Sequence, residues 1–197
     1  YGKTKSNSVL CIAPSHNGLL LGGSAGSSDA LLMKLDLSGN MLWSRKYRAG
    51  STQQIDDCIE TSEHTIIAVG TNQAANANKL FQPLIIMTDS VGDLLWEVTL
   101  NSWFGRLQAV TETNDGGFLA VGYLDQGDFF DFRGVAVKVD ALGNVLWTRS
   151  YSDYGKEQFQ GIYEFPNGDL LMVGNTNSFR INGSPSQQQH VLAIRTD

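Results

Sequence analysis

Short apolar runs alternate with polar turn residues along the whole chain, and one combination of the two recurs. An apolar run that closes with glycine occurs in HNGLLLGG, EHTIIAVG, DGGFLAVG and NGDLLMVG. The closing glycines are Gly23, Gly70, Gly122 and Gly174, at intervals of 47, 52 and 52 residues. A pattern that returns at an interval of about fifty residues is typical of a protein built from structural repeats. The sequence therefore predicts four copies of one unit.

A second pattern follows each of the first three glycines and confirms the repeat. The run Lys34–Trp43 (KLDLSGNMLW) returns as Met87–Trp96 (MTDSVGDLLW) and as Lys138–Trp147 (KVDALGNVLW), whereas the fourth copy stops at Arg195-Thr-Asp. Asp followed three residues later by Gly is a turn signal, because Asp bonds the backbone two residues on and Gly adopts a positive φ. We expect turns here, and not calcium ligands.

Each copy is predicted to hold four short strands, and no helical periodicity is present. In the third copy the predicted strands are Leu107–Glu112, Phe118–Gly122, Val135–Asp140 and Val145–Tyr151. Apolar residues at consecutive positions of the middle strands indicate that both faces of the sheet are covered. Repeated sheets of this kind stack radially in a β-propeller, whereas a linear solenoid uses shorter repeats. The predicted fold class is all-β, a β-propeller of four-stranded antiparallel blades in a single domain, with blades of approximately residues 1–47, 48–100, 101–151 and 152–197.

The last strand of each copy carries an aromatic residue in one slot. Alternation places Trp43, Trp96 and Trp147 on the same face of equivalent strands. We expect each tryptophan to wedge between neighbouring blades, because a buried aromatic side chain removes a large area from water. This structural role leaves little reason to assign the three residues to substrate stacking.

Composition narrows the range of partners. The 197-residue chain has 14 Lys and Arg against 20 Asp and Glu, a net charge of −6, and no basic run. It therefore lacks the electrostatic attraction for nucleic acids or anionic membranes. No apolar stretch is long enough to insert into a membrane. The first residue, Tyr1, precedes no signal-peptide pattern, so we expect a mature or trimmed segment.

The two motifs D-x-x-G-N-x-x-W and D-G-G-F-L-A-V-G resemble the repeats of secreted bacterial β-propellers related to the quinoprotein-like superfamily, and the likeness covers the whole chain. That superfamily includes enzymes, outer-membrane assembly scaffolds and surface-exposed binding proteins, so the fold does not define the function. The resemblance implies a secreted or cell-surface location, extracellular or periplasmic. Its quinone-dependent enzymes also need a vicinal cysteine pair, whereas Cys11 and Cys58 are distant in this sequence.

The fourth copy lacks its Trp-bearing strand, and Tyr1-Gly2 matches the end of such a strand. The first and last strands commonly share a blade in closed propellers. We therefore expect either a segment of a larger ring, completed by further blades or another chain, or a complete four-bladed ring.

Loops of unequal length are predicted at one end of the ring, after the second strand of each copy and between copies. Variable loops on a rigid scaffold are where binding sites usually lie. Aromatic and charged side chains there suit a protein or glycan ligand. The candidate ligand-binding residues are Trp103, Phe104, Arg106, Asp125, Asp128, Phe129, Phe130, Asp131 and Tyr154.

Structural explanations compete with this interpretation. The aromatic residues could instead cap the blade edges, and the three aspartates of this group do not have the alternating ligand spacing of an EF-hand. No cofactor is predicted; calcium is possible but not favoured. His16, His64 and His190 have no zinc spacing, and the chain has no nucleophile elbow or phosphate loop.

Two further sets of residues share equivalent slots when counted back from the closing glycines. Cys11 and Cys58 share one slot, and we expect free thiols there because equivalent residues of adjacent blades are too far apart for a disulfide. Glu60, Glu112 and Glu164 share another, where they could act as a ring of acids or bases or could bond turns and neighbouring blades.

We therefore predict a non-enzymatic extracellular binding or scaffold propeller that recognises a protein or glycan through the variable loops. The alternative is a carbohydrate-active hydrolase or lyase that uses Glu60, Glu112 or Glu164.

Overall fold

The computed structural model describes residues 7–26, 28–47, 52–73, 81–125, 132–151, 156–177, 180–181, 184–185 and 189–196. The secondary structure of these residues consists of β-strands and turns without a helix. Within the same residues, nothing qualifies as a helix long and apolar enough to cross a membrane. The chain divides into two compact units, Tyr1–Asn101 and Ser102–Asp197.

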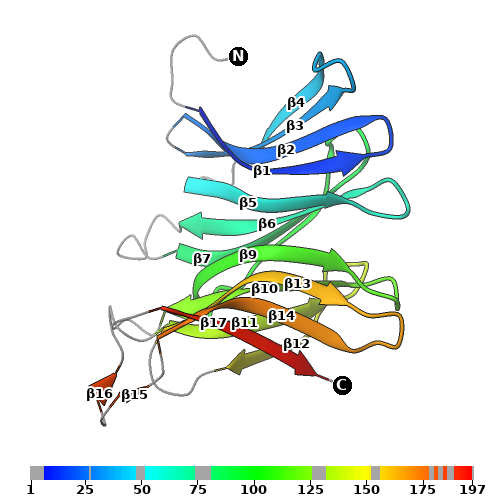
Figure 1. The fold of residues 1–197 in the computed structure, drawn as a ribbon. Helices are drawn as coiled ribbons and strands as arrows, with labels where there is room; N and C mark the ends of the chain where they lie inside the picture. Colours follow the sequence, from blue (N-terminus) through cyan, green and yellow to red (C-terminus); the bar gives the residue numbers. More distant parts are fainter. Residues whose placement is uncertain are drawn as a thin grey trace. The chain divides into compact units, whose positions relative to one another are not determined.

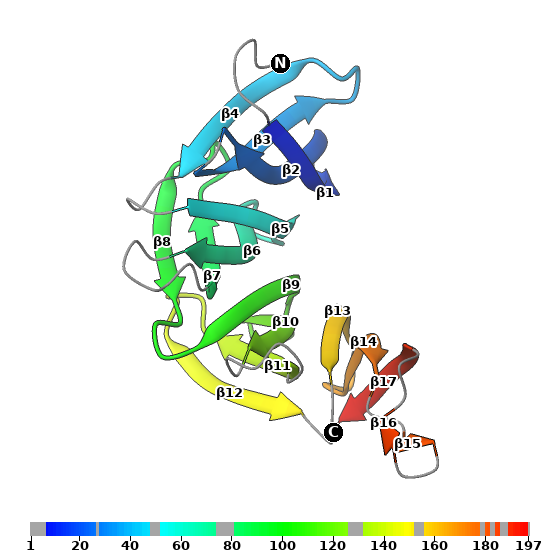
Figure 2. The same cartoon turned by 90° about the vertical axis from the view of Figure 1, so that its left-hand side faces the viewer.

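Unit 1 contains two antiparallel four-stranded sheets, each formed by consecutive strands (Figure 1). The strand order runs from the first strand at one edge to the fourth strand at the other (Figure 2). The first sheet holds β1 (Asn7–Ser15), β2 (Gly18–Ala25), β3 (Asp29–Asp36) and β4 (Met41–Tyr47), and the second holds β5 (Thr52–Glu60), β6 (Ile66–Gln73), β7 (Phe81–Thr88) and β8 (Leu94–Thr99).

Unit 2 repeats this plan with one difference. Its third sheet has four strands and its fourth sheet has three, in the order β13-β14-β17. The third sheet holds β9 (Phe104–Glu112), β10 (Phe118–Asp125), β11 (Phe132–Val139) and β12 (Val145–Tyr151); the fourth holds β13 (Glu157–Glu164), β14 (Leu170–Thr176) and β17 (His190–Thr196); β15 (Arg180–Ile181) pairs with β16 (Ser184–Pro185). The all-β class and the antiparallel four-stranded sheets are thereby confirmed.

The middle strands form the core, as their unbroken apolar runs predicted. Ile66–Val69 and Val135–Val137 are fully buried. Ile66 and Ala68 of the second sheet pack with Leu20 and Leu32 of the first. Consecutive side chains of a strand point to opposite faces, so both faces of these strands are covered. Burial of the apolar side chains on both faces removes them from water and stabilises the sheets.

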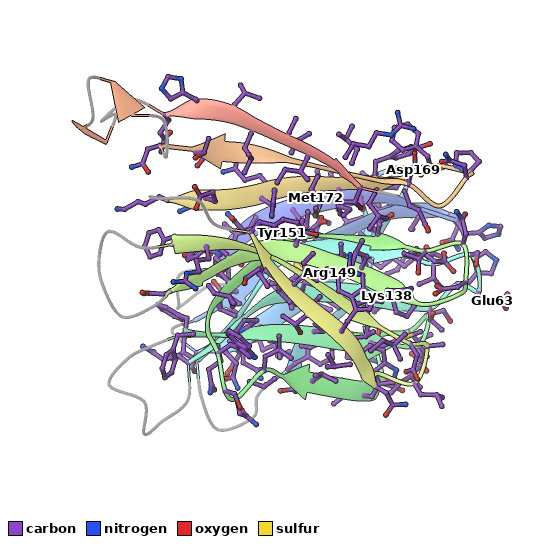
Figure 3. All side chains as sticks on the ribbon, turned by 90° about the horizontal axis from the view of Figure 1, so that it is seen from below. Glu63, Lys138, Arg149, Tyr151, Asp169 and Met172 are labelled. Atoms are coloured by element: carbon purple, nitrogen blue, oxygen red, sulfur yellow. The ribbon has the colours of Figure 1, made fainter. Side chains whose placement is uncertain are left out.

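The fourth strand joins neighbouring sheets within each unit through a Trp-x-Arg-x-Tyr sequence. In β4 the hydroxyl of Tyr47 donates to the carbonyl of Gly92 over 2.7 Å. Trp43 packs so closely on Gly92 that an added Cβ would lie 3.0 Å from its ring. In β12, Trp147 and Tyr151 pack against a cluster that includes Met172, a residue of the fourth sheet. Figure 3 labels Tyr151 and Met172. The predicted packing against a neighbouring sheet is confirmed for Trp43 and Trp147.

A β-bulge recurs in the first strand of every sheet, opposite the closing glycine. The pairing shifts there between Val9 and Cys11 and, in the second sheet, between Ile55 and Asp57. The bulge brings a carbonyl of the first strand against the glycine: a Cβ on Gly70 would lie 2.0 Å from the backbone oxygen of Gln54. This close approach explains why the closing position is glycine in all copies.

The first hairpin of the first sheet is one residue shorter than its equivalents. Pro14 pairs with Leu19, whereas Glu60 pairs with Ile66, so four residues join the first pair and five the second. Glu112 and Glu164 pair in the manner of Glu60. A one-residue change of register turns side chains to the opposite face of a sheet. A residue of β1 therefore faces the opposite side of its sheet from the residue of β5 that lies at the same distance in sequence from the closing glycine.

Candidate functional site

Four of the nine predicted ligand-binding residues lie in the described part of unit 2: Trp103, Phe104, Arg106 and Asp125. The structure places them around the start of β9 and the end of β10, at the end of the third sheet that carries the longer loops. The remaining five, Asp128, Phe129, Phe130, Asp131 and Tyr154, lie outside the described residues.

The pairing of β9 with β10 brings these residues together. Phe104 lies opposite Asp125, and Arg106 lies opposite Tyr123. The Tyr123 ring is 5.0 Å from that of Phe132 on β11. We name the six residues at this end of the sheet the loop-end cluster: Phe104, Arg106, Tyr123, Asp125, Phe132 and Lys156.

Lys156, the residue directly before β13 of the same unit, completes the cluster. Its ammonium lies 5.0 Å above the centroid of the Phe132 ring, and its backbone forms a parallel bridge to Phe132. A cation over an aromatic face is attracted by the negative charge of the π system. Trp103, next to the cluster in sequence, is 40% exposed. This end of the unit therefore presents aromatic rings beside groups of both charges.

A second site lies in unit 1, at the end that carries the tight turns. The Glu60 carboxylate, at the end of β5, accepts a hydrogen bond from the backbone N–H of His16 over 3.0 Å. It also pairs with the Lys34 ammonium over 3.3 Å and with Nδ1 of His64 over 3.1 Å. Glu60 and Lys34 are almost fully buried. The carboxylate thus links the second sheet to a turn and a strand of the first.

Burial raises the pKa of Glu60, but the His16 N–H, the Lys34 ammonium and the His64 ring outweigh it and hold the pKa below its ordinary value. Glu60 is therefore ionised at neutral pH and is unsuited to act as a general acid. These groups border a cavity of about 400 Å³, lined by His16, Asn17, Lys34, Leu42, Trp43, Glu60, His64, Ser90 and Val91.

The structure brings together two histidines that sequence spacing did not connect. The rings of His16 and His64 have their centroids 4.7 Å apart. His64 adopts a φ of +61°, uncommon for a residue with a side chain, in the turn between β5 and β6. Among the described residues, no group of three or more His, Cys, Asp or Glu side chains is placed to hold a metal ion.

Unit 2 uses the equivalent glutamate in the same way. Glu164, at the end of β13, accepts a hydrogen bond of 2.7 Å from the backbone N–H of Asn114 in a turn of the third sheet. Lys138 reaches that turn too: it bonds Thr113 and lies 2.6 Å from Asp115. The hydrogen bond from Lys138 is the main reason that the pKa of Asp115 falls to about 2. Glu60 and Glu164 therefore both join neighbouring sheets.

The Asp-x-x-Gly turns have the predicted structure. The Asp36 carboxylate accepts hydrogen bonds from the backbone N–H groups of Ser38 and Asn40 at 2.9 and 2.8 Å, and Asp140 repeats this arrangement with Leu142 and Asn144. The glycines Gly39, Gly92 and Gly143 have φ between +83° and +84°. The oxygens of these aspartates serve the turn itself.

The prediction that Cys11 and Cys58 are distant is wrong. Their Sγ atoms are 3.2 Å apart, and both are free thiols. The shorter first hairpin explains the error: Cys11 lies opposite Gly22 on β2, whereas Cys58 lies opposite Ala68, one position further from the closing glycine. The two cysteines are therefore not equivalent and point toward each other from facing sheets.

The sequence matches no family model and no curated protein.

Proposed function

We propose that the four sheets are blades of a β-propeller that serves as a non-enzymatic binding or scaffold module, located outside the cytoplasm. Three features support the propeller assignment: the repeated strand order, the repeated bulge, and the Trp-x-Arg-x-Tyr sequences that pack against a neighbouring sheet. The resemblance to secreted propellers supports the location.

The loop-end cluster is the surface that we propose for ligand recognition. The observation that carries this proposal is the juxtaposition of the Tyr123 and Phe132 rings with the Lys156 ammonium, beside the charged Arg106 and Asp125. Aromatic faces stack on sugar rings or apolar side chains, while the charged groups bond hydroxyls or peptide groups. These are the interactions that a glycan or a protein segment offers.

The environments of Glu60 and Glu164 support a binding role over the hydrolase or lyase alternative. Glu60 and Glu164 are occupied in bonds to turns of a neighbouring sheet, and Glu60 is ionised beside a buried lysine. A glycosidase needs a carboxyl group that holds its proton near neutral pH. The environment of Glu60 does the reverse, because it lowers the pKa.

The experiment compares the wild-type protein with Trp103→Ala and Lys156→Ala on an array of oligosaccharides and on an array of extracellular protein domains. We expect the wild-type protein to bind on one of the arrays. In both variants the affinity should fall by about tenfold or more, which corresponds to about 1.4 kcal/mol. Leu142→Ala is the matched control, because Leu142 is 78% exposed in a tight turn at the opposite end of the third sheet. Binding that both variants retain would refute the proposed surface.

A further inference from the structure

The two cysteines of unit 1 form a close pair between its two sheets. Their sulfur atoms are 3.2 Å apart. Cys58 is fully buried in the core between the sheets, whereas Cys11 is partly exposed at the edge of the same core. A disulfide bond is about 2.05 Å long, so a shift of roughly 1 Å would bring the sulfurs to bonding distance.

Two departures from the repeat occur together at this pair. The first hairpin is one residue shorter, which turns Cys11 toward the second sheet. The residue opposite Cys11 is Gly22, where the other copies have Val69, Val121 and Val173. A Cβ on Gly22 would lie 2.6 Å from Sγ of Cys11 and 3.3 Å from Sγ of Cys58. Because Gly22 has no side chain, the two sulfur atoms have room beside it.

We propose that Cys11 and Cys58 are a redox site that forms a disulfide across the two sheets of unit 1, with a small-molecule disulfide such as oxidised glutathione as the oxidant. This inference is independent of the proposed binding function, because it rests on other residues in the other unit.

The reaction proceeds in two thiol–disulfide exchanges. The thiolate of Cys11, the more accessible partner, attacks one sulfur of the oxidant, forms a mixed disulfide and releases one glutathione thiolate. The deprotonated sulfur of Cys58 then attacks Sγ of Cys11 and displaces the second glutathione thiolate. The two protons from the cysteines pass to the released thiolates. The protein loses two electrons and two protons, and oxidised glutathione is reduced to two molecules of glutathione.

The environment of the pair determines the order of attack. The hydrogen bond to Cys11 is the largest cause that raises the pKa of Cys58, and burial is the next largest. This thiol therefore stays protonated while both cysteines are reduced. A protonated buried thiol is a poor nucleophile toward an external oxidant. Oxidation therefore starts at Cys11, and the internal step follows because the second sulfur is already in contact.

The test uses the purified 197-residue chain, reduced and then equilibrated with oxidised glutathione. We expect both thiols to be lost in a thiol titration under denaturing conditions, and the intact mass to fall by two hydrogen atoms. Peptide mapping without reductant is expected to identify a cross-linked peptide that contains Cys11 and Cys58. The oxidised protein is expected to keep the oligomeric state of the reduced protein and to unfold at a higher temperature.

Matched variants separate this site from incidental oxidation. Cys58→Ala is expected to retain glutathione on Cys11 as a stable mixed disulfide, whereas Cys11→Ala is expected to react far more slowly. Gly22→Val, which restores the residue of the other copies, is expected to suppress the cross-link; circular dichroism establishes whether each variant is folded. Two titratable thiols in the wild-type protein after equilibration, or a disulfide that only joins two chains, would overturn the proposal, whatever the variants do.

Discussion

At the scale of single residues, Glu60 connects the two sheets of unit 1. Its carboxylate accepts from a backbone N–H of the neighbouring sheet and pairs with a buried ammonium. A buried charge is tolerated when its partner and its hydrogen bonds are in place, and removal of one partner leaves the other uncompensated. Glu60 and Lys34 are therefore expected to depend on each other for stability.

We predict that Glu60→Gln lowers the free energy of unfolding by about 2 kcal/mol, because Lys34 keeps its charge and loses its counterion. Urea denaturation of the wild-type and variant proteins at neutral pH measures the difference. Glu164→Gln is the matched control, since Glu164 accepts a backbone hydrogen bond that a glutamine oxygen also accepts. We expect a loss below about 1 kcal/mol for this control.

The stabilisation by Glu60 has a defined pH dependence. Its pKa in the folded protein lies below the ordinary value of 4.5, so the ionised form is favoured by folding. The contribution is complete above the unfolded pKa and is lost as the pH falls through the folded pKa. The difference between wild type and Glu60→Gln should therefore shrink as the pH falls below about 4.5. A difference that persists in acid would show that packing, and not charge, is responsible.

Sequence reasoning identified Glu60 but not its surroundings. Its slot at the end of the first strand, and a bond to a neighbouring blade as one of its roles, followed from the repeat. His16, Lys34 and His64 come to it from different strands and turns. Contacts between side chains of two sheets depend on how the sheets pack against each other. No local pattern in a single sequence specifies that packing.

At the scale of elements, the bulge in the first strand explains the most regular feature of the sequence. The closing glycine is needed because the bulged strand approaches it too closely for a side chain. Backbone atoms, unlike the end of a flexible side chain, cannot move aside at low cost. The repeat of about fifty residues is thus a repeat of one backbone irregularity as well as of apolar strands.

We predict that Gly70→Ala lowers the free energy of unfolding by about 3 kcal/mol, as expected for overpacking against the backbone. The added Cβ would lie 2.0 Å from the carbonyl oxygen of Gln54. Gly39→Ala is the matched control: its φ is +84°, but no atom lies within 4 Å of the added Cβ. That substitution should cost only about 1 kcal/mol, through the left-handed backbone. Equal losses in urea denaturation would argue against a role of the bulge.

The strands were predictable because each is bounded by turn residues and carries its own apolar pattern. β12 agrees with the prediction at both ends, and β9 begins three residues earlier than predicted. The register of β1 was not predictable by counting, since counting assumes hairpins of equal length. One missing residue between Pro14 and Leu19 was enough to turn Cys11 to the opposite face.

At the scale of the whole molecule, the fourth sheet differs from the other three. β17 holds the position of β3, β7 and β11, but it is the edge strand of its sheet among the strands described. An edge strand presents N–H and C=O groups that can pair with another strand. If the sheets are propeller blades, this edge accepts a fourth strand of the Trp-x-Arg-x-Tyr type.

We predict that a peptide with the sequence of β12, VLWTRSY, pairs with β17 when it is added to the protein. The third sheet provides the template, because β12 pairs with β11 from Gly134–Tyr151 to Val139–Val145. Hydrogen exchange measures the result: the amides of β17 that point away from β14 should exchange about tenfold more slowly, equivalent to about 1.4 kcal/mol of protection.

The two aromatic side chains of β12 provide a second comparison for this experiment. Trp147 and Tyr151 of β12 pack on the neighbouring sheet in unit 2, so a strand at the β17 edge would need the same two side chains to bury a face against the next blade. Where no further blade is present, the backbone pairing alone should hold the peptide, and a Trp→Ala peptide should protect β17 equally well. A stronger effect of the tryptophan peptide would mean that a second surface lies beside this edge, as in a larger ring or an assembly of chains. Protection of strands other than β17, or none, would argue against a four-stranded blade at this position.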